Sequence, residues 1–349
     1  MIFSSEQVSR GHPDKICDQI SDAILTYLLE EDMDSRVAVE TMIKDRSIYI
    51  VGEVTSKAPL SVSIIKREIS PIFKGIKLDI DDYMIHMNIS KQSPDIAMGV
   101  DTGGAGDQGM MFGYATNETP EMLPIPFAVA TYALKLLDIE KNPMLTSDAK
   151  SQVSYDYDTG KITTFLISTS HKEKYETKDF YDYVKSVMTR SAEHYNLNTD
   201  FEILINPTGR FVVSGAFSDA GLTGRKIIAD TYGGMAHHGG GAFSGKDYTK
   251  VDRSGAYMAR KVAKDIVRAG LCDKCEVQVA YAIGVKEPVS LYVDTFGTEK
   301  AEIETIYEKV KSYDWTPAGI IEQLNLKQVD YTKTSIYGHF GNKDVPWER

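Results

Sequence analysis

The amino-acid sequence predicts an α+β fold with three similar tandem domains, each a β-sheet with helices packed on one face. The chain of 349 residues is longer than one ordinary domain, and its 42% hydrophobic and 26% charged residues are typical of globular proteins. A pattern of helix, strand pair and helix also occurs three times at similar intervals. Such a pattern indicates repeated supersecondary units.

The first unit is predicted to begin with a helix at Pro13, because proline favours the first helical position. The apolar residues from Ile16 to Leu28 recur at helical spacing. Two strands of alternating polarity follow, joined by a short polar turn, and then an amphipathic helix and a further strand. In chain order, these elements are predicted at 13–28, 36–43, 47–55, 60–73 and 83–89.

The second and third units repeat this order. In the second unit, Asp158-Thr159-Gly160 is a turn sequence that predicts a hairpin. Helix, hairpin, helix and strand are predicted there at 127–137, 152–157 with 161–168, 180–195 and 202–205. In the third unit, helix, two strands and helix are predicted at 252–267, 276–283, 289–295 and 299–313.

The boundaries between the units are predicted at the glycine-rich stretch after Ser93 and at the turn 206–209. No low-complexity segment or long polar linker lies between the units. The predicted domains are therefore 1–97, 103–212 and 213–345. The alternative is that helices and hairpins alternate by chance, since the repeat is supported by spacing and not by residue identity.

Charge and composition exclude several broad classes of protein. The net charge of −11 argues against general binding to nucleic acid or to an anionic membrane, because both would be repelled. The N-terminus lacks the pattern of a signal peptide, and no apolar run is long enough to span a bilayer. Three cysteines argue against a disulfide framework. We therefore expect a cytoplasmic protein.

Two glycine-rich segments imitate nucleotide-binding motifs without their context. Residues 104–109 match G-x-G-x-x-G, but no helix start follows them, which argues against a dinucleotide fold. Residues 240–246 match G-x-x-x-x-G-K, but Asp247 stands where a P-loop has Ser or Thr. A glycine-rich backbone beside Lys246 can still hold phosphates. The alternative is a merely flexible loop.

A local excess of positive charge supports phosphate binding. From Arg225 to Lys264 the chain has eight Lys or Arg residues against three Asp. Part of this excess is predicted to be the solvated face of a helix, with Arg260, Lys261 and Lys264. Three of the other cations, Arg225, Lys226 and Lys246, lie in glycine-rich segments where a polyanion can approach the backbone.

Carboxylates occur at positions that suit cations or a helix cap. Asp14 lies in the first turn of the first helix, where the helix dipole stabilises it with or without a function. Together with Asp252 it could hold magnesium, which takes one or two carboxylates plus substrate phosphates. Glu40 and Glu53 interrupt largely apolar strands. They are either solvent-facing or held inward to bind a cation or an ammonium group.

Taken together, these segments resemble the signatures of the S-adenosylmethionine synthetase family in its bacterial and eukaryotic form. The resemblance runs from Phe3 to Trp347. It implies three similar domains in a pseudo-threefold arrangement, homodimers that share active sites and commonly pair into homotetramers, ATP and L-methionine as substrates, and Mg²⁺ (two per site) and K⁺ as cofactors. The matching segments are 11–15, 104–118, 148–153, 206–211, 221–234, 239–247 and 337–341.

The resemblance also implies roles for individual residues. It assigns His12, Lys150, Arg225 and Lys246 to catalysis. It assigns ATP binding to Glu6, His12, Asp148, Lys150, Arg210, Phe211, Asp219, Arg225, Lys226, Ala242 and Lys246. It assigns methionine to Glu53, Gln92, Asp107, Asp219 and Lys250. It assigns magnesium to Asp14 and Asp252, and potassium to Glu40.

The residue types suit the chemistry that the family implies. A neutral thioether attacks C5′ of ATP without losing a proton, so the main demand is to stabilise a tripolyphosphate leaving group, which metals, Lys, Arg and His⁺ can do. The family also implies hydrolysis of tripolyphosphate to phosphate and pyrophosphate. The segment 101–106 is shorter than the acidic loop of many relatives, which puts their gating mechanism in doubt here. Two rival functions are a kinase or ATPase, and a catalytically silent homologue.

Overall fold

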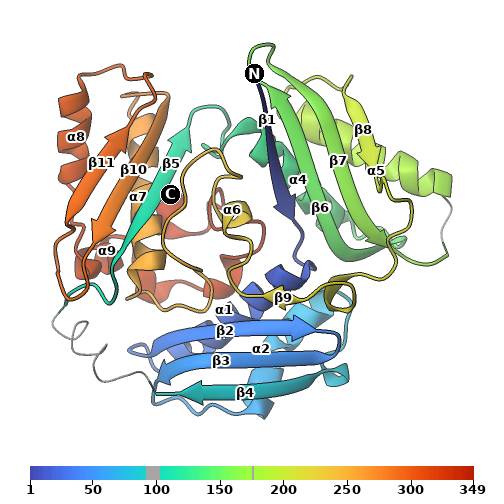
Figure 1. Cartoon of the computed structure of the whole chain (residues 1–349), viewed down its shortest axis with the longest axis horizontal. Helices are drawn as coiled ribbons and strands as arrows, with labels where there is room; N and C mark the ends of the chain where they lie inside the picture. Colours follow the sequence, from blue (N-terminus) through green and yellow to red (C-terminus); the bar gives the residue numbers. More distant parts are fainter. Residues whose placement is uncertain (92–102, 175–176) are drawn as a thin grey trace.

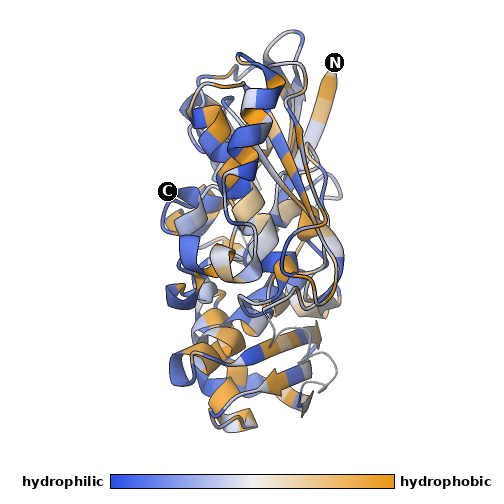
Figure 2. Ribbon diagram, turned by 90° about the vertical axis from the view of Figure 1, so that its left-hand side faces the viewer, coloured by the Kyte–Doolittle hydropathy of each residue, from blue (hydrophilic) through white to orange (hydrophobic). Residues whose placement is uncertain are grey.

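The computed structural model describes residues 1–91, 103–174 and 177–349, and the described residues form three β-sheets around a common centre (Figure 1). Seen edge-on, the molecule is thinner than it is wide (Figure 2). The first sheet has the order β4-β3-β2-β9, with strands Met84–Ser90, Ser47–Thr55, Arg36–Lys44 and Gly221–Leu222. The second has the order β1-β6-β7-β8, with Ile2–Val8, Leu145–Asp156, Lys161–His171 and Glu202–Ile205. The third has the order β11-β10-β5, with Ser290–Asp294, Lys274–Tyr281 and Gly109–Thr116.

Helices cover one side of each sheet (Figure 1). The first sheet packs against α1 (Pro13–Glu31) and α2 (Val62–Gly75). The second packs against α4 (Ile125–Glu140) and α5 (Thr177–His194). The third packs against α7 (Val251–Arg268) and α8 (Ile303–Lys311), with α9 (Pro317–Gln323) beside α7. The short helix α6 (Ile227–Asp230) lies near the centre of the molecule (Figure 1).

The three units exchange strands in a cycle. Each unit contains an antiparallel hairpin, β2-β3, β6-β7 or β10-β11, and the first strand of each hairpin pairs with one strand from elsewhere in the chain. Strand β1 precedes the first unit but joins the second sheet, β5 precedes the second unit but joins the third sheet, and β9 precedes the third unit but joins the first sheet. This cyclic exchange makes the three-unit fold a single interlocked structure.

Local sequence explains why the main elements form where they do. Helix α1 begins at Pro13, and the His12 side chain caps it by accepting a hydrogen bond from the Asp14 amide. Strand β2 alternates buried and more exposed residues, as expected when one sheet face is covered. The predicted helices and hairpins are confirmed, with ends shifted by at most four residues except for β6, which begins at Leu145, seven residues before its predicted start. Strands β1 and β5 were not predicted, and residues 104–109 lead into a strand and not a helix.

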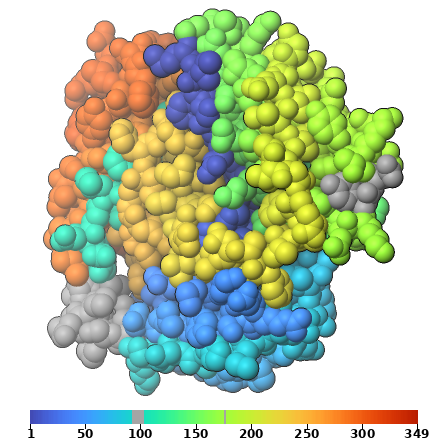
Figure 3. Space-filling model, turned by 45° about the vertical axis from the view of Figure 1, so that its right-hand side comes forward, coloured from blue at the N-terminus to red at the C-terminus, as the bar shows by residue number. Residues whose placement is uncertain are grey.

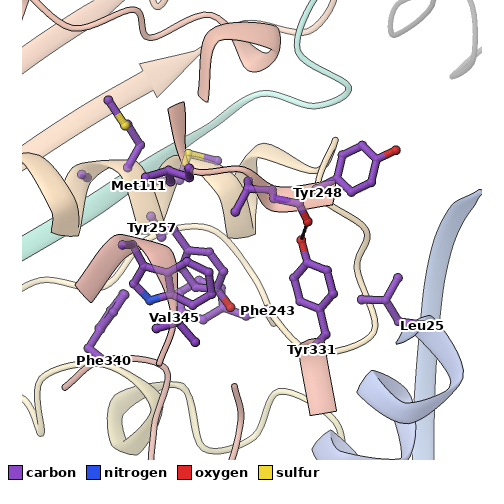
Figure 4. Close-up of a cluster of buried hydrophobic side chains, with 14 of the residues drawn as sticks. Leu25, Met111, Phe243, Tyr248, Tyr257, Tyr331, Phe340 and Val345 are labelled. Carbon is purple, nitrogen blue, oxygen red and sulfur yellow. Dashed lines mark hydrogen bonds between the residues drawn. The ribbon is translucent and has the colours of Figure 1, made fainter. Parts of the chain in front are cut away.

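The hydrophobic residues form two buried clusters. The larger one joins the first and third units, and the smaller one lies in the second unit. Aromatic residues from several segments meet in the larger cluster (Figure 4), where Tyr257 of α7 stacks on Trp347 with ring centroids 3.7 Å apart. The C-terminal segment is therefore anchored in the core. Among the described residues, no helix is long and apolar enough to cross a membrane.

One expectation about α7 is wrong. Arg260 and Lys264 do not lie on a solvated helix face, because both side chains are buried and form ion pairs with Glu348. The Arg260 guanidinium also donates to the carbonyls of Tyr114 and Met122. A buried guanidinium needs this many acceptors to offset its desolvation. These two cations therefore fasten the C-terminal segment to α7, and only Lys261 is partly exposed.

Candidate functional site

A cleft of about 300 Å³, which we call the His12 cleft, lies between the start of α1 and the second sheet. In Figure 3 it lies where the dark blue N-terminal segment is visible between the green and yellow surfaces. It gathers six of the residues assigned to ATP by the sequence: His12, Asp148, Lys150, Arg210, Phe211 and Asp219. These residues come from four separate segments, so the fold and not the local sequence brings them together.

The His12 side chain is uncharged in the free protein. Burial lowers the pKa of His12 to about 3, and nearby Lys226 and Lys150 lower it as well. Its Nδ1 accepts a hydrogen bond from the Asp14 amide at 3.2 Å, so the ring proton lies on Nε2. In the free protein, His12 therefore offers a neutral N–H donor.

Asp14 lies beside this cleft, and Arg225 and Lys226 face it from the loop that follows β9. Its side chain is almost fully buried. The carboxylate forms an ion pair with Lys226 and lies 3.8 Å from the Nε of Arg225. The hydrogen bonds from Lys226 and from the Leu222 amide keep the pKa of Asp14 below its usual value, although burial alone would raise it. Asp14 is therefore a carboxylate, next to two cations that are free to turn toward a polyanion.

Helix α1 holds the loops at 221–226 and 239–247 through a stripe of three aspartates. Asp14, Asp18 and Asp22 are four residues apart and therefore share one face of the helix. Each carboxylate accepts one backbone N–H bond of 2.9 Å, in this order from Leu222, Gly224 and Gly245. Each also pairs with a cation, in the same order Lys226, Lys15 and Arg253.

Asp18 and Asp22 were not predicted to be part of this site. They fix the backbone of the loops that carry Arg225, Lys226 and Lys246. The i, i+4, i+8 spacing of the three aspartates was the signal available in the sequence. It was overlooked because such a stripe normally indicates the solvent-exposed face of an amphipathic helix.

A second cleft, of about 180 Å³, lies at the other end of the first sheet, and we call it the Lys246 cleft. It gathers residues that the sequence assigned to methionine, ATP and magnesium: Glu53, Asp107, Lys246, Lys250 and Asp252. Lys246 Nζ forms an ion pair of 2.7 Å with Asp252, and the Gly241 amide donates to the same carboxylate at 3.1 Å. A Cβ added to Gly241 would lie 3.0 Å from Lys246 Nζ, so the glycine leaves room for the ammonium group.

The two clefts are separate cavities within one chain. Lys246 forms a backbone β-bridge with Ala38 of β2. Leu222, whose amide donates a hydrogen bond to Asp14, pairs instead with Met42 of the same strand. Residues four apart on a strand are separated by about 13 Å. The two sets of lining residues have no member in common.

The other predicted site residues lie around these clefts. Ala242 packs close to Gly224, next to Arg225. Glu6 of β1 pairs with Gln152 of β6 in the second sheet. Two residues further along β1, Val8 pairs with Lys150, which lines the His12 cleft. Glu40 lies exposed on the open face of β2, and its carboxylate makes no hydrogen bond or ion pair with any residue in the described ranges. Gln92 lies outside the described residues, as does part of the short 101–106 segment.

Three family models together match almost the whole chain. They are the N-terminal, central and C-terminal domains of S-adenosylmethionine synthetase, which match residues 1–94, 102–211 and 213–349. Among curated relatives, the S-adenosylmethionine synthases of Mycoplasma mycoides subsp. mycoides and Mycoplasma capricolum subsp. capricolum are each 48% identical over 100% of this chain and 94% of their own length. The S-adenosylmethionine synthase of Mycoplasmopsis synoviae is 47% identical over 99% of this chain and 94% of its own length.

Proposed function

Because the chain belongs to the S-adenosylmethionine synthetase family, we propose that its two clefts supply the parts of one active site. The chain makes S-adenosylmethionine from ATP and methionine. The main structural support for the proposed site is the pair of clefts, each of which has lysine and carboxylate groups beside a glycine-rich loop.

The proposed reaction needs charge stabilisation and no general base. A lone pair of the methionine sulfur forms the bond to C5′ of ATP, and the bond from C5′ to the triphosphate oxygen breaks with its electron pair. Negative charge grows on the leaving tripolyphosphate, and donors placed around it lower the barrier. Water then divides the tripolyphosphate into phosphate and pyrophosphate.

We assign the polyphosphate to the cations of both clefts. In the His12 cleft, Lys150 and Arg210 line the cavity, while Arg225 and Lys226 stand next to Asp14. His12 donates a hydrogen bond from Nε2 without carrying a charge. Asp148, Phe211, Asp219, Glu6 and Ala242 then surround the nucleoside part of ATP.

We assign methionine to the Lys246 cleft. Glu53 and Asp107 place two carboxylates there, which attract the substrate ammonium group and tolerate the sulfonium that forms. Lys250 supplies a cation for the substrate carboxylate, and its own position is fixed by a 3.0 Å ion pair with the buried Asp247. Gln92 and Asp219 complete the proposed set.

Magnesium fits this donor set as an ion carried mainly by the nucleotide. Asp14 and Asp252 supply one carboxylate near each cleft. Within the described ranges, no group of three or more His, Cys, Asp or Glu side chains is placed to hold a metal ion. Magnesium commonly takes one or two carboxylates plus phosphate oxygens, which matches this arrangement. When bound, two such ions would neutralise charge on the polyphosphate.

We propose that two chains form each active site and that the open face of the first sheet is buried in the homodimer. The apolar residues Met42, Tyr49 and Val51 remain 40%, 38% and 44% exposed on this face, and Tyr49 stacks on His86 with centroids 4.6 Å apart. An exposed apolar sheet of this kind is typical of an obligate interface. The His12 cleft of one chain would face the Lys246 cleft of its partner. Pairing of dimers into a homotetramer remains part of this proposal.

We also propose a cytoplasmic location. Cys17, Cys272 and Cys275 are all free thiols, as expected in a reducing compartment.

Replacing Glu40 with glutamine should weaken activation by potassium more than it weakens the dependence on magnesium. The unpartnered Glu40 carboxylate on the open sheet face fits a monovalent cation held between two chains. The rate should be measured against potassium at saturating magnesium, and then against magnesium at saturating potassium. Glu202→Gln, which changes an exposed glutamate on β8, is the matched control. An unchanged potassium response in active Glu40→Gln protein contradicts the assignment.

The affinity for ATP should fall as the pH drops below about 6. Burial raises the pKa of Asp148 to about 6, so its carboxylate gains a proton near that pH. If the ionised form accepts a hydrogen bond from ATP, the KM for ATP should rise about tenfold from pH 7 to pH 5, since one pH unit below the pKa leaves about a tenth of the groups ionised. Asp148→Asn should have a raised KM that no longer changes over this range. A KM profile equal to that of the wild type in Asp148→Asn would exclude this role.

One assay tests the proposed function as a whole. Purified protein is mixed with ATP, methionine, Mg²⁺ and K⁺, and S-adenosylmethionine, phosphate, pyrophosphate and ADP are quantified. We expect S-adenosylmethionine, phosphate and pyrophosphate in equal amounts and no ADP. A kinase or ATPase would release ADP, and a silent homologue would form none of these products.

A further inference from the structure

A third cavity lies behind the His12 cleft, and we call it the Lys77 pocket. Its volume is about 150 Å³, and it lies between the ends of α2 and α4 and the start of β6. Leucines of α4 and β6 form its apolar wall. Its polar lining consists mainly of Arg10, Lys74, Lys77, Asp138, Lys141 and Tyr337.

The Lys77 pocket carries an excess of positive charge in an acidic protein. Four cationic side chains line it against one carboxylate, Asp138, which lies 3.5 Å from Arg10. Lys74, Lys77 and Lys141 form no ion pair with any residue that the structure describes. The Nε of Arg10 is buried and likewise lacks a hydrogen-bond partner within the described ranges. The three lysines are exposed and therefore solvated, and the excess of cations over carboxylates around the cavity favours an anion.

The backbone around the pocket is unusual as well. Lys77, Lys141 and Tyr337 have φ angles of 63°, 47° and 61°, in the left-handed region that glycine and asparagine prefer. A lysine in the last turn of a helix stabilises the helix dipole in an ordinary conformation, as Lys74 does in α2. Lys141 is the C-cap of α4 and Lys77 follows the C-cap of α2, so both cations also lie at the negative end of a helix dipole.

The pocket shares a wall with the His12 cleft. Ser9 Oγ donates to the Ser147 carbonyl at 2.7 Å and accepts from the Ala149 amide at 2.8 Å. Gly11 packs so closely that an added Cβ would lie 2.4 Å from the Ser147 carbonyl oxygen. Ser9, Ser147 and Ala149 line the Lys77 pocket, and their chain neighbours include residues of the His12 cleft.

We propose that the Lys77 pocket binds a compact polyphosphate anion, represented by pyrophosphate, at a site distinct from the two clefts of the active site. The positive excess of the lining matches a multiply charged anion better than a singly charged one. The volume is below the roughly 300–1,000 Å³ of pockets that enclose drug-sized ligands, so a whole nucleotide does not fit inside. The anion is therefore either free or the end of a nucleotide whose nucleoside stays outside.

Calorimetric titration of the full-length protein with pyrophosphate tests the proposal. The active site is first filled with a non-hydrolysable ATP analogue and excess Mg²⁺, without methionine. The wild type should then bind one further pyrophosphate per chain. The double variant Lys77→Gly with Lys141→Gly should bind it at least tenfold more weakly. Because glycine suits both left-handed positions, this variant should keep or exceed the thermal stability of the wild type.

Lys309→Gln with Lys311→Gln, two exposed lysines of α8 in the third unit, is the charge-matched control and should bind like the wild type. A parallel titration with ADP identifies the source of the anion: ADP binding of equal strength assigns the site to a nucleotide's phosphate chain, and much weaker ADP binding assigns it to free pyrophosphate. The proposal is overturned if the loaded wild type binds no further pyrophosphate, or if the folded double variant binds it as tightly as the wild type. Because binding is measured, a failure of the proposed catalytic function would not be confused with either result.

The shared wall predicts a second effect that can be measured in turnover. At saturating ATP, pyrophosphate should still lower the rate of the wild type through the Lys77 pocket, and the double variant should lose this residual inhibition. Equal residual inhibition in both proteins would overturn coupling between the Lys77 pocket and the His12 cleft.

Discussion

Replacing Lys246 with alanine should lower kcat by a factor of about 10²–10³ while the protein remains folded, which is the usual effect of removing one donor that stabilises charge in a transition state. Lys246 lies in a glycine-rich loop at the surface of its cleft, and its ammonium group has one ion-pair partner, Asp252, at 2.7 Å. The loop itself is held by other contacts, since the Gly245 amide donates to Asp22 and the Val39 amide donates to the Gly245 carbonyl. Loss of the side chain therefore leaves the backbone in place.

Single-turnover rates and thermal unfolding should be measured together for this variant. Lys300→Ala is a suitable control, because Lys300 also forms a lysine–aspartate pair, with Asp273 at 2.5 Å, on an exposed surface outside both clefts. The control should turn over like the wild type. A normal rate in folded Lys246→Ala protein would remove Lys246 from the set that binds the polyphosphate, whereas a lower unfolding temperature would indicate a structural role.

The sequence predicted the repeated units because their evidence is local. Apolar periodicity defines α1, α5 and α7, and turn residues define the hairpin of β6 and β7. The cyclic exchange of β1, β5 and β9 has no local signal. Strand β9 has only two residues, and the partner of each exchanged strand lies far away in the sequence. Such pairings follow from the assembled core and not from the strand's own residues.

The loops of the site were predicted, but its buried ion pairs were not, for a similar reason. Glycines next to cations identified the loops at 221–226 and 239–247, and the structure places each loop beside a cleft. Buried charge was misjudged, because a single sequence does not reveal which charged residues acquire partners. Asp22 pairs with Arg253, and Lys264 pairs with Glu348, from distant segments. From the sequence alone, Asp22 and Lys264 are indistinguishable from solvent-exposed helix residues, because their partners are distant in the chain.

Mixing two inactive variants should restore activity if each active site is built from two chains. Lys150→Ala disables only the His12 cleft, and Lys246→Ala disables only the Lys246 cleft. Lys150 is exposed on β6, so its replacement should leave the fold intact. In a heterodimer, one site combines both defects, while the other site combines two unaltered clefts. With random pairing of equal amounts, about a quarter of wild-type activity should return, since half of the dimers are mixed and each has one intact site.

The two variants should be unfolded together and refolded, with each variant refolded alone as the control. Differently sized tags identify the heterodimer by native mass spectrometry, so that failure to mix is distinguished from failure to complement. If one chain contained the whole site, every chain in the mixture would carry a defect, and the mixture would be no more active than its parents. Verified heterodimers without recovered activity would therefore refute the shared site. The expected recovery, about a quarter of wild-type activity, stands well above the residual rate of either parent, about a hundredth or less of the wild type.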